Sequence, residues 1–258
     1  MTEFDPSSPS MARVYDYWLG GKDSFAADRE VADQVLALYP PTADIVRENR
    51  QFLSRAAAWA AKQGIGQFID LGAGLPTPPN VHESAGAVIP DARVAYVDHD
   101  VVAIRHLQAL AASGNPGVTV VDGDVHETAA ILDAVSAGID LSLPACLIMG
   151  ALLHSIEAET SRDLVRRYIA ALAPGSYVVL SVIRGDGQIA SEGFCAYNDG
   201  GPAVGHNHSV AEFTGFFGGL ELVPPGVVDA RAWWPDGPGP VALPPRAGQA
   251  LVGVARVN

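Results

Sequence analysis

Five short apolar runs alternate with helix-length segments between residues 67 and 183, and this alternation most limits the possible folds. The apolar runs lie at 67–71, 92–98, 117–124, 144–152 and 176–183. They are nearly continuous in hydrophobic residues, which is typical of strands covered on both faces of a parallel sheet. The sequence therefore predicts an α/β fold with a doubly wound, mostly parallel sheet.

The segments before this alternation are predicted to be a polar tail and three helices. Helices are predicted at 11–19, from about 24 to 38, and at 43–63. Ser10 is the expected N-cap of the first helix, and Gly20 and Gly21 are expected to end it. Residues 1–9 are polar and contain two prolines, so we expect them to be disordered. The predicted organisation is a single domain with a tail over 1–9, a helical cap over 10–63 and an α/β core over 64–258.

The alternation ends after residue 183. Residues 184–208 are polar and rich in glycine, and a helix is expected at 209–217. Two apolar runs follow, at 220–225 and 249–257, with no helix between them. Such a connection suits an antiparallel strand pair at the edge of the sheet.

Charge and composition exclude several partners. The chain has 16 basic and 29 acidic residues, a net charge of −13, and no dense basic run. Such a surface repels phosphate backbones, so we expect no nucleic-acid partner. With no apolar signal region and no apolar stretch of ~18 uncharged residues, we expect a cytoplasmic chain with no membrane partner. Cys146, Cys195 and the histidines of HNH at 206–208 indicate neither a disulfide framework nor a metal site.

A glycine turn follows the first strand, in the stretch FIDLGAGLPTPPN at 68–80. Its glycines allow a ligand to approach the backbone, and the next helix, expected from Pro78 with Thr77 as its cap, offers unpaired amides. A dinucleotide site would need a third glycine, which GAGLPT lacks. Asp70, two residues before Gly72, would repel a diphosphate but attract an ammonium or a sulfonium. The turn therefore favours S-adenosylmethionine, with an NAD(P)-dependent oxidoreductase as the weaker alternative.

Acidic residues also end the next two strands. Asp98 is placed to accept hydrogen bonds from the ribose hydroxyls, and Asp124 to accept one from the adenine amino group. Asp100 is expected to cap the helix after the second strand. The candidate cofactor residues are Asp70, Gly72, Ala73, Gly74, Asp98, His99, Asp124, Val125 and Gly150.

Longer motifs resemble one known family. They are ARVYDYWLGGKDSFAADRE at 12–30, RENRQFLSRA at 47–56, IGQFIDLGAGLPTPPNVHE at 65–83, VAYVDHD at 94–100, LAPGSYVVLS at 172–181 and FFGGLELVPPGVV at 216–228. On these motifs the chain resembles the actinobacterial S-adenosylmethionine-dependent methyltransferase family called DUF574. The resemblance implies a class I, Rossmann-like fold with seven strands, one of them reversed, and an N-terminal helical cap. It also implies cofactor contacts at Asp70, Gly72, Gly74, Asp98 and Asp124.

Candidates for the acceptor side lie in three segments. His154, after the fourth strand, is the candidate general base; the alternative is a histidine that only satisfies a helix start. The segment RVYDYWLGGKD is predicted to be a lid, and the alternative is a helix that packs its aromatic residues on the core. The candidate lid residues are Arg13, Tyr15, Tyr17, Trp18 and Lys22. One of Arg47 and Arg50 is a candidate partner for the cofactor's carboxylate, unless both are solvated.

The sequence therefore predicts an S-adenosylmethionine-dependent methyltransferase that acts on a small-molecule acceptor and needs no metal. The alternative from another class is a non-catalytic protein that binds S-adenosylmethionine or S-adenosylhomocysteine. The acceptor atom and the oligomeric state stay open at this point.

Overall fold

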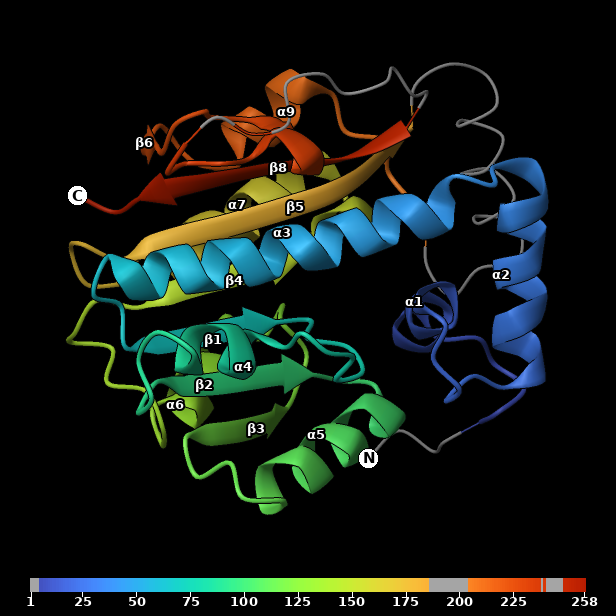
Figure 1. Cartoon of the computed structure of the whole chain (residues 1–258), viewed down its shortest axis with the longest axis horizontal. Coiled ribbons are helices and arrows are strands. Elements are labelled where there is room, and N and C mark those ends of the chain that lie inside the picture. The colour runs from blue at the N-terminus through green and yellow to red at the C-terminus, as the bar shows by residue number, and fades with distance from the viewer. Residues whose placement is uncertain (1–4, 186–203, 238, 240–247) are drawn as a thin grey trace.

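One mixed sheet forms the centre of the molecule (Figure 1). The computed structural model describes residues 5–185, 204–237, 239 and 248–258. Within these ranges the strands are β1 (Gln67–Leu71), β2 (Arg93–Asp98), β3 (Val118–Asp122), β4 (Cys146–Gly150), β5 (Tyr177–Gly185), β6 (Glu221–Leu222), β7 (Val228–Asp229) and β8 (Gly248–Arg256). Their order is β3-β2-β1-β4-β5-β8-β6, and β7 pairs with β8. The predicted α/β class is confirmed.

The first five strands are parallel, and the reversed strand is β8. β1 pairs with β2 and β4, β2 with β3, and β4 with β5, all in parallel. β8 runs antiparallel to β5 from the Tyr177–Arg256 pair to the Gly185–Gly248 pair. The sheet has eight strands in the described chain rather than seven, and β8 lies one place in from the edge because the short β6 pairs with its outer side.

Helices cover both faces of the sheet. They are α1 (Met11–Leu19), α2 (Ala26–Leu38), α3 (Thr42–Lys62), α4 (Val81–Gly86), α5 (Val101–Ala112), α6 (Thr128–Val135), α7 (Ala158–Ile169) and α9 (Val210–Gly215), with 3-10 turns η1 (Leu153–Ser155) and η2 (Ala230–Ala232). On one face α7 and α9 bury Tyr168 and Phe213 in the same cluster as Ile69 of β1. On the other face α3 buries Phe52 with Phe68 of the same strand. Neighbouring residues of β1 thus enter opposite layers, which explains its continuous hydrophobic sequence.

The three N-terminal helices occupy two different places. α3 runs along the face of the sheet in front of β4 and β5 and contacts β8 (Figure 1). α1 and α2 lie at the end of the molecule toward which β1 and β2 point (Figure 1). There Val14, Trp18 and Val31 form a separate small cluster with Val46 of α3. Within the predicted cap over 10–63, α3 therefore belongs to the sheet layer, and only α1 and α2 stand over the strand ends.

Three details at element ends differ from expectation. The side chain of Ser10 does not cap α1; its hydroxyl donates to Asp100 Oδ2 at 2.5 Å instead. α4 begins after Asn80 rather than after Thr77, and the Asn80 amide donates to Glu83 Oε2 at 2.6 Å. Residues 5–9, expected to be disordered, are placed, and Ser8 O accepts from Arg13 at 2.6 Å. Asp100 caps α5 as predicted, since its carboxylate accepts from two amides of the first turn.

Two further expectations concern parts of the chain near or beyond the described residues. Cys146 is buried in β4, whereas Cys195 lies outside the described ranges, as does most of the polar segment expected over 184–208. Within the described ranges, no helix combines the length and the apolar character needed to cross a membrane.

Candidate functional site

A cavity of about 620 Å³ lies at the carboxyl ends of β1, β2, β3 and β4. The loops that follow these four strands form its floor, and α1 with the residues just before it forms one wall. In a doubly wound sheet this is where ligands bind. All nine candidate cofactor residues line the cavity: Asp70, Gly72, Ala73, Gly74, Asp98, His99, Asp124, Val125 and Gly150.

The glycine turn is folded back against the second strand. Gly72 and Gly74 have φ of 69° and 65°, which L-residues with a side chain rarely adopt. The amides of Gly72 and Ala73 donate to Val97 O at 2.9 and 3.1 Å, and the Gly74 amide donates to Asp98 Oδ2 at 2.7 Å. The turn is therefore fixed by its hydrogen bonds to the end of β2, and its two glycines add no side chain to the cavity wall.

The carboxylate of Asp98 is held in place by backbone amides. Oδ1 accepts from the amides of His99 and Asp100, both at 2.8 Å, and Oδ2 accepts from Gly74. Three of its roughly four acceptor positions are thus used by the protein. Asp98 lines the cavity, so about one acceptor position is left for a ligand.

Asp70 is a buried carboxyl group with unusual acidity. Its side chain lines the cavity, yet the residue is only 6% exposed. Burial raises the pKa of Asp70 to about 7, an effect that the nearby Arg50 guanidinium opposes and the Asp98 carboxylate reinforces. A cation placed in the cavity would stabilise the ionised form of Asp70, whereas a phosphate would not.

Asp124 differs from the other two acids because it lies at the rim. More than half of its side chain is exposed, and Oδ1 accepts from the amide and from Nδ1 of His126 at 2.9 and 2.8 Å. The next residue, Val125, is buried, and its carbonyl accepts from the Tyr168 hydroxyl at 2.8 Å. The loop after β3 therefore presents an apolar side chain beside a polar rim.

The predicted lid segment contributes only part of its side chains to the cavity. Arg13 and Tyr15 line it. Trp18 is buried in the α1–α2 cluster and donates to Ala32 O at 3.2 Å, and Tyr17 donates to Asp33 Oδ1 at 3.0 Å. Lys22 is exposed.

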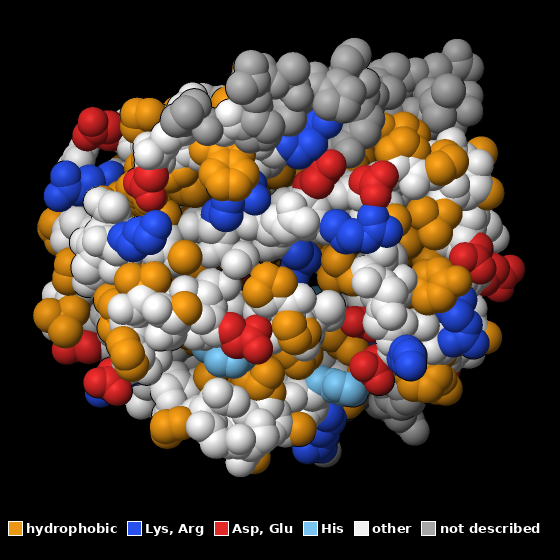
Figure 2. Space-filling model, viewed as in Figure 1, with side chains coloured by type: hydrophobic (Ala, Val, Ile, Leu, Met, Phe, Trp, Pro, Cys, Tyr) orange, Lys and Arg blue, Asp and Glu red, His pale blue; other side chains and the backbone are white. Residues whose placement is uncertain are grey.

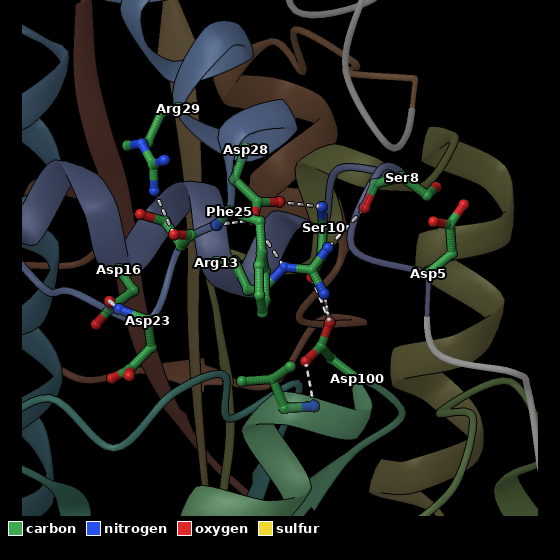
Figure 3. Close-up of polar contacts among 12 residues, drawn as sticks. Asp5, Ser8, Ser10, Arg13, Asp16, Asp23, Phe25, Asp28, Arg29 and Asp100 are labelled. Carbon is green, nitrogen blue, oxygen red and sulfur yellow. Dashed lines mark hydrogen bonds and ion pairs between the residues drawn. The ribbon is translucent and has the colours of Figure 1, made fainter.

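Arg13 connects α2 and α1 to the loop after β2 (Figure 3). Its Nε donates to Asp28 Oδ2 at 2.8 Å, and its Nη1 lies 3.5 Å from Asp100 Oδ2. Ser10 adds two bonds, from its amide to Asp28 Oδ1 at 2.8 Å and from its hydroxyl to Asp100. Since the Asp100 amide also holds Asp98, the α1–α2 unit is bonded to the turn that positions this carboxylate.

Two further charged residues line the cavity. Arg50 of α3, one of the two arginines considered for the cofactor's carboxylate, faces the cavity, whereas Arg47 is exposed and pairs with Asp44. Asp16 of α1 also lines the cavity, and sequence reasoning missed it. The sequence feature that could have pointed to Asp16 is its place in the motif YDYWLGG.

His154 does not reach the cavity. Its neighbours Ser155 and Ile156 line the wall, but the His154 ring is buried on the other side of η1, where its Nδ1 accepts from the Ile183 amide at 3.4 Å. Burial, with smaller effects of His208 and His206, lowers the pKa of His154 to about 4. This placement favours the structural alternative over the general base. Nor do the described residues hold a group of three or more metal-ligating side chains.

The chemistry of the cavity can be tested against the cofactor. Asp70 and Asp98 present carboxylates where a diphosphate would be repelled, and the two glycines of the turn add no side chain to the cavity wall. Arg50 also lines the cavity, so its guanidinium is available for an anionic group of a ligand. A ligand with two cations, one carboxylate and a ribose fits this set, and S-adenosylmethionine has these groups.

The strand order, the reversed strand β8 and the acids at successive strand ends together define a Rossmann-like methyltransferase fold. A family model described as S-adenosyl methyltransferase matches residues 1–258, and the chain belongs to this family. It is an S-adenosylmethionine-dependent methyltransferase, as the resemblance implied.

Solved structures agree with this assignment. A candidate methyltransferase from Thermobifida fusca YX is 38% identical, with 97% of this chain and 96% of that chain covered and a TM-score of 0.90. A DUF574 family protein from Streptomyces avermitilis MA-4680 is 35% identical, with 98% and 99% covered and a TM-score of 0.90. A search of curated proteins finds no match.

A more distant structure shows the fold alone. The 1,6-didemethyltoxoflavin-N1-methyltransferase of Burkholderia thailandensis, solved with its substrate and S-adenosylhomocysteine, is 18% identical, with 80% and 78% of the two chains covered and a TM-score of 0.50.

Proposed function

We propose that this methyltransferase transfers the methyl group to a small-molecule acceptor. The cavity of about 620 Å³ has the size of a small-molecule site. The net charge of −13 disfavours a phosphate backbone as substrate. On the face shown in Figure 2, lysine and arginine side chains lie among acidic ones and form no continuous band in the coloured part of the surface.

We assign the cofactor contacts to the residues that meet at the strand ends. Asp70 faces the cationic part of the cofactor, Asp98 accepts from the ribose, and Asp124 with Val125 binds the adenine. The observation that carries this assignment is that all nine predicted residues line one cavity. With three amides already on Asp98, its free acceptor capacity suffices for about one ribose hydroxyl.

S-Adenosylmethionine supplies an electrophilic methyl group on a sulfonium when it is bound. The contribution of the protein is then mainly alignment, which can lower a barrier by roughly 7–11 kcal/mol. We assign the acceptor side of the cavity to Gly150, Leu152, Ser155 and Ile156 and to Tyr15 of α1, all of which line it. Because His154 lies outside the cavity, we propose an acceptor whose nucleophile does not depend on this histidine as a base.

Residues 5–19 are proposed to be a lid over the bound cofactor. This segment forms one wall of the cavity and is hydrogen-bonded to two of its loops. Ser10 bonds to Asp100 in the loop after β2, and Asp16 bonds to Thr77 in the loop after β1. Hydrogen exchange tests the proposal: S-adenosylhomocysteine should slow exchange of the α1 amides. Unchanged exchange in α1 at saturating ligand would argue against a lid.

Calorimetric titration tests the cofactor assignment. S-Adenosylmethionine and S-adenosylhomocysteine should bind to the native chain, and Asp98→Ala should abolish the signal. Asp122→Ala is the matched control, because Asp122 ends β3 but is exposed and does not line the cavity. Titration with NAD tests the oxidoreductase alternative, and binding of NAD without binding of the adenosyl compounds would refute the assignment.

A further inference from the structure

The charged side chains of the cavity are bonded to two of its four loops. In the loop after β1, the Thr77 hydroxyl donates to Asp16 at 2.9 Å and the Thr77 carbonyl accepts from Arg50. In the loop after β2, an arginine of α1 lies 3.5 Å from Asp100. The loop after β4, residues 150–156, is different. Within the described chain, no aspartate, glutamate, lysine or arginine side chain forms a hydrogen bond or an ion pair with it.

Apolar side chains lie beside the loop after β4 instead. Leu53 of α3 lies directly on Gly150, because a Cβ added to this glycine would be 2.5 Å from Leu53 Cδ1. Leu152 lies on Gly72 of the glycine turn in the same way, at 3.0 Å. Both leucines line the cavity, and so does Ile156, which is buried. Leu53, Leu152 and Ile156 thus give the cavity an apolar wall.

Tyr15 contributes its ring to this part of the cavity rather than a free hydroxyl. The hydroxyl donates to Val46 O at 3.2 Å and accepts from Asn49 Nδ2 at 2.9 Å. Both partners belong to α3, so the hydroxyl is held toward that helix. Burial raises the pKa of Tyr15, so the phenol stays protonated at neutral pH and does not serve as a base.

The other groups that could take up a proton lie away from the apolar wall. His154 lies outside the cavity. His99 and His126 are exposed, on the loops after β2 and β3. Asp70 lies at the end of β1 and is assigned to the cationic part of the cofactor. An acceptor at the apolar wall therefore meets, among the described lining residues, no side chain suited to remove its proton.

The charge of the cavity lining limits the acceptor further. Aspartates outnumber arginines six to two in the described lining, which contains Asp5, Asp16, Asp70, Asp98, Asp100 and Asp124 against Arg13 and Arg50. This excess of acids disfavours an anionic nucleophile, such as a carboxylate or a phenolate. It favours a positive charge that forms on the acceptor during methyl transfer.

We propose that the acceptor is an aromatic amine that is neutral at pH 7 and lies with its ring against the apolar wall. This inference rests on the proposed function and names the substrate class. A neutral amine already has a free lone pair, whereas an alcohol or an aliphatic ammonium must first lose a proton. The lone pair forms the nitrogen–carbon bond while the carbon–sulfur bond breaks and leaves its electrons on sulfur. The positive charge moves to the methylated nitrogen, which releases a proton to water after it leaves the cavity.

Four naphthalene probes test this class, because they share the ring and differ in the polar group. They are 2-naphthylamine, 2-naphthol, the anion 2-naphthoate and the ammonium of 2-(aminomethyl)naphthalene. In calorimetry on the native chain saturated with S-adenosylhomocysteine, the amine and the naphthol should bind at least about tenfold more tightly than 2-naphthoate. Tighter binding of 2-naphthoate would overturn the inference.

Methyl transfer separates the amine from the other probes. With S-adenosylmethionine at pH 7, mass spectrometry should find a methyl group on 2-naphthylamine and on neither 2-naphthol nor the ammonium probe. Transfer to 2-naphthol or to the ammonium probe would show that a base acts at the apolar wall and would refute the amine as the acceptor class. The absence of transfer to 2-naphthylamine would refute it as well.

One variant tests the apolar wall itself. Ile156→Thr should lower the affinity for 2-naphthylamine by about 4- to 30-fold, the range for losing a buried methylene and burying a hydroxyl, and should leave the affinity for S-adenosylhomocysteine within about twofold. Ile169→Thr is the matched control, because Ile169 of α7 is half-buried and does not line the cavity, so neither affinity should change.

The outcomes separate this inference from the proposed function. Unchanged binding of 2-naphthylamine in Ile156→Thr, or equal losses for both ligands, would refute the apolar wall as the acceptor side. If S-adenosylhomocysteine binds the native chain but neither neutral probe does, the substrate class alone is wrong. If S-adenosylhomocysteine does not bind the native chain, the proposed cofactor contacts are wrong.

Discussion

Replacing Arg13 by methionine should destabilise the protein strongly, because the partner it leaves behind cannot reach water. Asp28 is 0% exposed, and its Oδ2 lies 2.8 Å from Arg13 Nε. The other bonds to the Asp28 carboxylate come from the neutral amides of Ser10 and Phe25. Methionine preserves much of the volume and the apolar stem of Arg13 but leaves Asp28 without a cation.

The expected magnitude follows from this burial. Removing one partner of a buried ion pair lowers the free energy of unfolding by about 3–5 kcal/mol, mostly because an uncompensated charge stays behind. Arg13→Met should fall in this range, since its contacts to Ser8 O and Asp100 are lost as well. The double variant Arg13→Met with Asp28→Asn should regain part of the loss, because the amide keeps a hydrogen-bonding group without a charge.

Urea unfolding followed by circular dichroism measures this effect. The midpoint should shift down at an unchanged slope if α1 and α2 unfold with the core. Arg29→Met is the control, because Arg29 follows Asp28 on α2 but is exposed, and its effect should stay within about 0.5 kcal/mol. A loss below about 1 kcal/mol for Arg13→Met would show that the Arg13–Asp28 pair is not held as the structure has it.

Four further predictions concern the cavity and the sheet. Because burial raises the pKa of Asp70 to about 7 and a bound cation favours its ionised form, affinity for S-adenosylmethionine should increase between about pH 6 and 8, and Asp70→Asn should remove this dependence in calorimetry. The same raised pKa gives the free protein stability that is lost as the pH rises from about 4 to 7, which acid and neutral unfolding curves would reveal. Gly72→Ala should lower the free energy of unfolding by about 1–2 kcal/mol, because φ is 69° and the new Cβ would lie 3.0 Å from a leucine methyl. In Gly66→Ala, the control, the new Cβ meets no atom within 4 Å, so urea unfolding should be unchanged. Trp233→Ala should lower the free energy of unfolding by about 3–5 kcal/mol, because Trp233 is fully buried against Phe52 of α3. Trp234→Ala should lower it by about 1 kcal/mol or less, because Trp234 is 41% exposed. Equal losses would contradict the packing of Trp233 on α3.

The sequence was sufficient for those parts of the site that depend on strand ends. Alternation of apolar runs predicts parallel strands, and parallel strands bring their carboxyl ends to one edge of the sheet. Asp70, Asp98 and Asp124 could therefore be placed together from the sequence alone, and all three line the cavity. The direction of a side chain on a short turn is not fixed in this way. His154 follows β4 as closely as Ser155 does, but the turn of η1 sends the histidine away from the cavity.

Contacts between distant segments were also beyond sequence reasoning. Asp16 and Thr77 are 61 residues apart, and their hydrogen bond depends on how α1 lies over the glycine turn. Ser10 has the right residue type for an N-cap, but a tertiary partner, Asp100, takes its hydroxyl. Local propensity predicts the helix in both cases, whereas the partners of its polar side chains follow from the packing of α1 against the core.

The cavity is built from an early part of the chain, whereas the sheet is completed late. Its described lining lies between Asp5 and Ile156, so β5 and β8 contribute none of these residues. During synthesis from the N-terminus, every one of these residues leaves the ribosome before β8, the strand that covers the whole length of β5. A nascent chain that stops short of β8 would have a complete set of lining residues beside an uncovered apolar strand, which is a template for pairing with another chain. Pairing with β8 therefore covers the strand edge that would otherwise favour aggregation of a newly made chain.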